Sequence, residues 1–100
     1  MIETVSVRLD EKLIKEVKKI GDELKSDRSE VIRRLIQQAV KDWKLKRAIE
    51  LLKNEEVSIG KASEIAEITL YEMINVAADN EIAIDYNEKE FLRDLKRFNL

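Results

Sequence analysis

Polar and apolar side chains alternate in the stretch TVSVRL, residues 4–9, near the start of the chain. This period of two residues is typical of a β-strand with one buried face. A strand needs a partner, because its backbone donors and acceptors must be paired. Val5, Val7 and Leu9 share one face, so we expect this strand to pair antiparallel with the same strand of a second copy. Pairing within the chain to IAID, residues 82–85, is the alternative.

The next periodic stretch predicts a first helix. Asp10 is placed to cap this helix, and Glu11 favours its first turn. The apolar positions follow at spacings of three and four residues and are Leu13, Val17, Ile20 and Leu24. Gly21 lies inside the pattern, and a glycine weakens a helix interior by about 1 kcal/mol relative to alanine. We therefore expect the C-terminal end of this helix to be weak or to stop early.

A second helix is predicted to start in SDRSEVIRRLIQQAV, where Asp27 and Glu30 have the spacing of a capping box. Its apolar side chains cover nearly half of the helix surface, and they are Val31, Ile32, Leu35, Ile36, Ala39, Val40 and Trp43. One short helix of the same subunit could not bury a stripe of this width, so the stripe predicts a homodimer. The helical pattern continues until KNEE, through Leu45, Ala48, Ile49 and Leu52.

The remaining sequence predicts three short helices. Ser58 is placed to cap the first, and Thr69 with Glu72 forms a capping box for the second, which gives the pair the spacing of a helix-turn-helix. An extended stretch, IAIDY, precedes a last start at Asn87. The apolar face of this last helix is made of Phe91, Leu92, Leu95 and Phe98.

The composition argues against an enzyme. The chain has 100 residues, 44% of them hydrophobic, and it contains no His and no Cys. It therefore lacks an imidazole base, a thiolate nucleophile and a soft metal site, and we expect no cofactor. No apolar run approaches the roughly 20 residues that cross a bilayer, and the first residues do not resemble a signal peptide. We expect a cytoplasmic protein.

Charge divides the chain into two unlike halves. Residues 1–50 carry 13 basic and 10 acidic side chains, a net charge of +3, whereas residues 51–100 carry 6 and 11, a net charge of −5. A mildly basic half tolerates a polyanion, and an acidic half repels one. The N-terminal half is therefore the part that could lie against a polyanion.

The predicted N-terminal strand carries side chains that suit DNA recognition. A two-stranded antiparallel ribbon fits the major groove, and Thr4, Ser6 and Arg8 would face the bases. Arginine can donate two hydrogen bonds to guanine, while hydroxyl groups adapt to several bases. At the start of the second helix, the backbone N–H groups of Arg28, Ser29 and Glu30 could hold a DNA phosphate. A solvated strand face and an ordinary helix cap are the competing interpretations of these features.

These N-terminal features resemble a known family of DNA-binding proteins. The VSVRL strand, the acidic cap after it and the RSEVIRRLI helix start are similar to the ribbon-helix-helix family of dimeric bacterial and archaeal repressors. The resemblance implies a ribbon-helix-helix domain over residues 1–43, with a swapped two-stranded ribbon in a homodimer. It also implies that Thr4, Ser6 and Arg8 read bases and that Ser29 clamps a phosphate. That family often has glycine in the turn near Lys25 and Ser26, whereas this chain does not.

We predict a second, helical domain over residues 44–100, of which about residues 44–95 resemble small helix-turn-helix proteins of unassigned function that look like antitoxins. The resemblance rests on EVSIGKASEIAEITLYEMI followed by IAIDYNEKEFLRDL, although that family often has glycine where this chain has Glu67. The predicted second helix offers no Lys or Arg between Leu70 and Asp79, so it suits a protein partner better than DNA.

The two resemblances together imply a mainly α-helical transcriptional repressor that is also the antitoxin of a PIN-type ribonuclease. The toxin would be held by the last helix, through Phe91, Leu92, Arg93, Leu95, Lys96, Arg97 and Phe98. Closure of the protein's own small core by the apolar members of this set is the alternative for these residues. For the whole protein, the alternative is a dimeric protein-interaction module that does not bind DNA.

Overall fold

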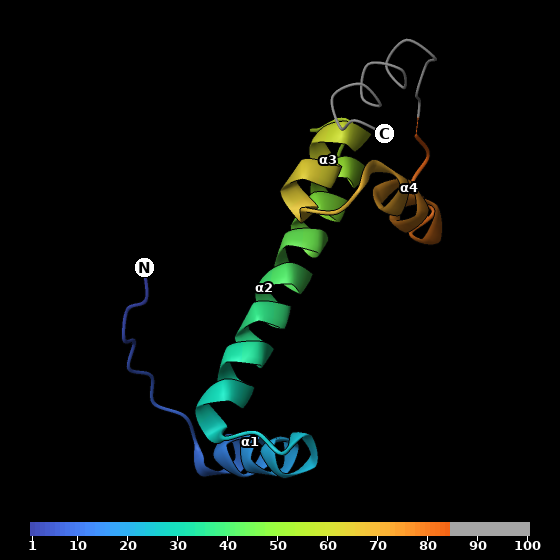
Figure 1. Cartoon of the computed structure of the whole chain (residues 1–100). Coiled ribbons are helices and arrows are strands. Elements are labelled where there is room, and N and C mark those ends of the chain that lie inside the picture. The colour runs from blue at the N-terminus through green and yellow to red at the C-terminus, as the bar shows by residue number, and fades with distance from the viewer. Residues whose placement is uncertain (85–100) are drawn as a thin grey trace. The chain divides into compact units, whose positions relative to one another are not determined.

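The computed structural model describes residues 1–84. Within them the chain forms four helices (Figure 1), which are α1 (Glu11–Leu24), α2 (Arg28–Lys53), α3 (Ile59–Ala66) and α4 (Leu70–Asp79). Contacts divide the chain into two units, residues 1–38 and residues 39–100, and the division falls inside α2. The last helix predicted from Asn87 lies outside the described residues.

The predicted two-stranded ribbon is wrong for this structure. Residues 1–10 have no regular secondary structure, and no β-strand occurs anywhere in residues 1–84, so the described chain is all-helical. Figure 1 shows the first residues as a plain extended segment that leads into α1. A strand exists only where a second strand pairs with its backbone. The alternative partner, IAID, does not supply one, because residues 82–84 are irregular and Asp85 lies outside the described range.

Helix α1 begins as the sequence predicts. The Asp10 carboxylate accepts a hydrogen bond from the Leu13 backbone N–H at 2.8 Å, which satisfies one of the free donors of the first turn. The helix does not stop early at Gly21, as the sequence suggested, but continues to Leu24. It ends at Lys25, which adopts the left-handed conformation with φ of 54° and donates its N–H to the Gly21 carbonyl.

Gly21 has a packing role that the sequence did not indicate. A Cβ atom built on it would lie 2.9 Å from the Ser26 carbonyl oxygen and 3.4 Å from Cγ2 of Val31. The chain therefore turns closely past the last part of α1, and only glycine leaves room for that path. Gly21, Val17 and Val31 are the buried residues of the first unit.

Helix α2 is continuous, as the apolar pattern predicts. Asp27 supplies its cap, because its carboxylate accepts a hydrogen bond from the Glu30 N–H at 2.8 Å and its carbonyl accepts one from the Val31 N–H. The C-terminal part of α2 contributes Ala48 and Leu52 to the core of the second unit. The buried remainder of that core comes from α3 and α4 and consists of Ile59, Ala62, Ala66, Leu70, Met73 and Ala77.

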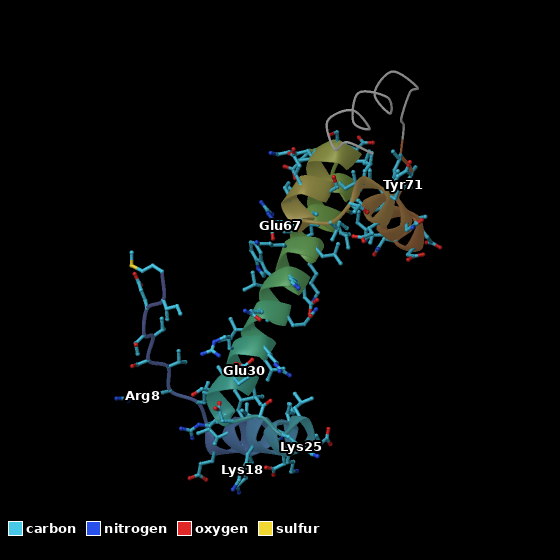
Figure 2. The ribbon with its side chains drawn as sticks, viewed as in Figure 1. Arg8, Lys18, Lys25, Glu30, Glu67 and Tyr71 are labelled. Carbon is cyan, nitrogen blue, oxygen red and sulfur yellow. The ribbon has the colours of Figure 1, made fainter. Side chains whose placement is uncertain are left out.

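Helices α3 and α4 form the two short helices expected from the caps. The Ser58 hydroxyl accepts from the Lys61 N–H, and Thr69 and Glu72 form a complete capping box. Glu67 ends α3 in the left-handed conformation with φ of 56°, where a glycine is commoner. Its carboxylate accepts a hydrogen bond from Lys44 Nζ at 2.9 Å, which connects the turn to α2 (Figure 2 labels Glu67).

Candidate functional site

The N-terminal segment is the first candidate for a binding surface. Thr4, Ser6 and Arg8 are all exposed, as are Val5 and Val7 between them. Figure 2 shows the Arg8 side chain pointing outward from the segment. The backbone of residues 1–9 makes no hydrogen bond to another residue of the described range. Both the backbone and the polar side chains of this segment are therefore available for contacts with another molecule.

The start of α2 offers fewer free donors than the sequence predicts. Arg28 and Ser29 are exposed at the first turn, where a phosphate could reach their N–H groups. The Glu30 N–H, however, already donates to the Asp27 carboxylate. That carboxylate also places a negative charge at the helix start, which opposes the approach of a phosphate. A phosphate contact at this end would therefore use Arg28 and Ser29, without Glu30.

The Glu30 side chain has a role that the predicted capping box did not include. Its carboxylate pairs with the guanidinium groups of Arg33 and Arg34, with 3.2 Å between Arg34 Nε and Glu30 Oε1 (Figure 2 labels Glu30). Helical spacings of three and four residues make this arrangement possible. Two basic charges near the start of α2 are thus held by one carboxylate, which lowers the local positive charge that DNA would meet.

Exposed apolar side chains gather in the N-terminal part of the chain. Ten of the eleven large hydrophobic side chains that are exposed in the described part lie in residues 1–43, so the exposed apolar surface is concentrated there. On helices α1 and α2 they are Leu13, Leu24, Leu35, Ile36, Val40 and Trp43, and Trp43 is 66% exposed. Contiguous patches of exposed apolar side chains often mark interaction sites, so this part of the chain is a candidate for one.

The apolar residues of α2 occupy two different sides of the helix. Val31 faces α1 and is buried, and Ala48 and Leu52 face α3 and α4. Ile36, Ala39 and Trp43 are exposed, and at about 100° per residue they lie roughly opposite Ala48 and Leu52. A shallow depression beside Trp43 is lined by Lys46, Arg47 and Glu50. The sequence placed Trp43 in the apolar stripe, but it did not separate the buried side from the exposed one.

Helix α4 presents an acidic surface. Tyr71, Glu72, Asn75 and Asp79 are exposed on it (Figure 2 labels Tyr71). Residues 62–84 carry five acidic side chains and no Lys or Arg, so this part of the second unit would repel a nucleic acid. The residues predicted to hold a toxin lie outside the described range, and they are Phe91, Leu92, Arg93, Leu95, Lys96, Arg97 and Phe98.

Two further features of residues 1–84 concern metal ligands and buried polar groups. No group of three or more acidic side chains in that range is arranged to hold a metal ion. Ser63, the buried polar side chain, donates its hydroxyl hydrogen to the Gly60 carbonyl at 2.7 Å, so it is satisfied within α3. None of the four helices is sufficiently long and apolar to cross a membrane.

Comparisons with known proteins identify a family and no individual relative. Neither the curated proteins nor the solved structures include a significant match to this sequence. The profile of the uncharacterised protein family UPF0175 matches residues 3–99, and so runs through both units. Since the match spans nearly the whole sequence, the chain belongs to the uncharacterised protein family UPF0175.

Proposed function

We propose that the protein is a homodimeric, DNA-binding transcriptional repressor that also serves as the antitoxin of a PIN-type ribonuclease. The observation that carries the proposal is the exposed first segment, in which Thr4, Ser6 and Arg8 alternate with apolar residues and the backbone is unpaired within the described chain. An extended segment is narrow enough to enter a groove of DNA. Arg8 would then donate to guanine, and the two hydroxyl groups would contact neighbouring bases.

The small core of the first unit supports the homodimer. Two buried valines, Val17 and Val31, contribute about 1.5–3 kcal/mol each, whereas ordering a residue costs about 1–2 kcal/mol. A unit of 38 residues usually needs a disulfide, a metal or association to be stable. The chain has no cysteine, so a disulfide cannot stabilise this unit. Its exposed apolar residues are concentrated in this part of the chain, which favours stabilisation by association with a second copy.

The division of charge supports separate tasks for the two halves. The first 50 residues carry a net charge of +3, and α4 lies in a stretch without any Lys or Arg. DNA contact is therefore assigned to the N-terminal unit and toxin binding to the C-terminal half. The toxin assignment rests on sequence resemblance, and the side chains proposed for it are Phe91, Leu92, Arg93, Leu95, Lys96, Arg97 and Phe98.

DNA binding is tested with the DNA that precedes the protein's own reading frame, at several salt concentrations. We expect a steep loss of affinity as salt rises, because phosphate contacts release counterions. Arg8→Ala should weaken specific binding by about 1–3 kcal/mol. Lys53→Ala is the matched control, since it removes one exposed positive charge from the end of α2 and should change little. Equal binding by the Arg8→Ala variant, with a shallow salt dependence, would refute the proposal.

One observation favours the second candidate, a dimeric interaction module that does not bind DNA. The Asp27 carboxylate occupies the start of α2, where a phosphate would otherwise be held. That function predicts an intact dimer with no salt-dependent DNA binding. Purification of the protein from its native host tests the antitoxin role independently of DNA binding. A copurifying ribonuclease would support the antitoxin role, and recovery of the dimer without a ribonuclease would contradict it.

A further inference from the structure

One side of α2 carries a heptad pattern that neither core uses. Six residues follow one another at alternating spacings of four and three, and they are Ile32, Ile36, Ala39, Trp43, Lys46 and Glu50. We name them the α2 seam. None of the six is buried, and Ile36 and Trp43 are 55% and 66% exposed. The first four of the six are apolar, and apolar positions at this spacing on an exposed helix are the pattern by which two helices pack side by side.

We propose that the α2 seam binds the α2 seam of a second copy in antiparallel orientation. This inference rests on the homodimer of the proposed function and names the surface that forms it. The occupant is a second copy because the seam is complementary to itself in both size and charge, as a twofold symmetric interface requires.

The sizes of the central residues set the register. Trp43 is the largest side chain of the seam and Ala39, one turn earlier, is the smallest. An antiparallel pair that places Trp43 opposite Ala39 of the second copy alternates large and small residues, which is the arrangement that fills space. In the same register Lys46 lies opposite Ile36 of the second copy, where its alkyl chain can cover the isoleucine while its ammonium group reaches solvent.

Charge decides between the two orientations. The seam ends on a carboxylate, Glu50, and it begins one turn after the exposed cation Arg28. In the antiparallel pair Glu50 lies opposite Ile32 of the second copy, within one turn of Arg28 of that copy. A parallel pair would instead place Glu50 against Glu50 and Lys46 against Lys46, and like charges brought together oppose association. The partner of Glu50 within its own chain is Arg47, at 3.7 Å, and both side chains are more than half exposed.

Cysteine cross-linking tests the orientation directly, because the natural chain has no cysteine. We expect a mixture of the Ile32→Cys and Glu50→Cys variants to form a mixed disulfide readily, since a disulfide needs Cα atoms within about 7 Å. Neither variant should cross-link to itself, because each lies far from the twofold axis. Glu56→Cys, exposed beyond the end of α2, is the control that should not react with Ile32→Cys.

Reversal of the charge at Glu50 gives a second test, which measures dimer affinity without any covalent cross-link. Glu50→Lys should raise the dimer dissociation constant roughly tenfold in sedimentation equilibrium, and Arg28→Glu in the same chain should restore it. Glu56→Lys makes the same change of charge outside α2 and should leave association unchanged.

Two results would overturn the pairing and leave DNA binding to be judged separately. Self-cross-linking of the Glu50→Cys variant would show a parallel pair. Absence of any cross-link in a sample that sediments as a dimer would place the interface elsewhere. If either result is found together with salt-dependent DNA binding, the antiparallel pairing of the α2 seam is refuted and the proposed DNA-binding function stands. A protein that sediments as a monomer at all concentrations would refute both the pairing of the α2 seam and the homodimer.

Discussion

Replacement of Gly21 by alanine tests the close approach of the backbone at Ser26 to α1. Helix propensity predicts that the change stabilises α1 by about 1 kcal/mol, because alanine favours a helix interior over glycine. The structure predicts the opposite sign. The added Cβ would lie 2.9 Å from the Ser26 carbonyl oxygen, which belongs to the backbone and cannot rotate away, and 3.4 Å from a methyl carbon of Val31.

The cost of relieving this contact sets the magnitude. The Ser26 N–H donates to the Gly21 carbonyl at 3.0 Å, and the Lys25 N–H donates to the same oxygen. Moving the turn outward by a few tenths of an ångström therefore strains two hydrogen bonds and loosens the packing of Val31. Overpacking of this kind costs about 1–3 kcal/mol, which exceeds the propensity gain. We expect Gly21→Ala to lower the free energy of unfolding by about 1–2 kcal/mol.

The assay is urea unfolding at one fixed protein concentration, followed by far-ultraviolet circular dichroism. Asp22→Ala is the matched control, because it lies on the exposed side of the same helix turn and gains helix propensity without a clash. It should raise stability by a few tenths of a kcal/mol. An increase for Gly21→Ala as large as that for Asp22→Ala would show that the turn does not pass close to Gly21, and our explanation of the αL cap at Lys25 would fail with it.

The same unfolding measurement checks two further predictions. Lys25→Gly should raise the free energy of unfolding by about 0.5–1 kcal/mol, because glycine adopts the left-handed conformation at φ of 54° without strain, while Lys25→Ala keeps the strain and should change little. Met73→Ala should lower it by about 2–5 kcal/mol, since Met73 of α4 is fully buried in the core of the second unit. Tyr71→Ala, two residues earlier and 54% exposed, should stay within about 0.5 kcal/mol of the natural protein. Equal losses for Met73→Ala and Tyr71→Ala would contradict the assigned core.

Sequence reasoning worked best where the cause of a structure is local. The caps Asp10, Ser58 and Thr69 were predicted correctly, because each depends on one side chain and the N–H group three residues later. The continuity of α2 was also predicted, since the helical spacing of its apolar residues runs across the boundary between the two units.

The errors arose where a distant part of the molecule decides the outcome. Gly21 appears in the sequence as a weak point, and only the path of the chain at Ser26 shows why it is needed. The left-handed conformation of Glu67 was unexpected, because glycine is the usual residue there; the structure adds an ion pair with Lys44 from α2. The ribbon failed for the same reason, since alternation in residues 4–9 describes a strand but does not supply one to pair with.

For the candidate site, too, local sequence predicted some features and missed others. Thr4, Ser6 and Arg8 are exposed, but so are Val5 and Val7, so their exposure does not distinguish a base-reading face from the rest of the segment. The phosphate contact at the start of α2 was predicted from the free N–H groups of a helix end, without counting the acid that caps it. Because Asp27 both caps α2 and carries a negative charge, the residue that identified the helix start also makes that start a poorer phosphate site.

The width of the apolar stripe on α2 links the fold to the proposed assembly. Counted as one face, the stripe from Val31 to Trp43 is too wide for a helix that packs against α1. The structure divides it into a buried side, occupied by Val31, and an exposed side that passes through Ile36, Ala39 and Trp43. The chain itself covers the buried side within the described residues, and the exposed side is the surface that we propose for a second copy. The proposed dimer therefore accounts for the part of the apolar stripe that the chain itself leaves exposed.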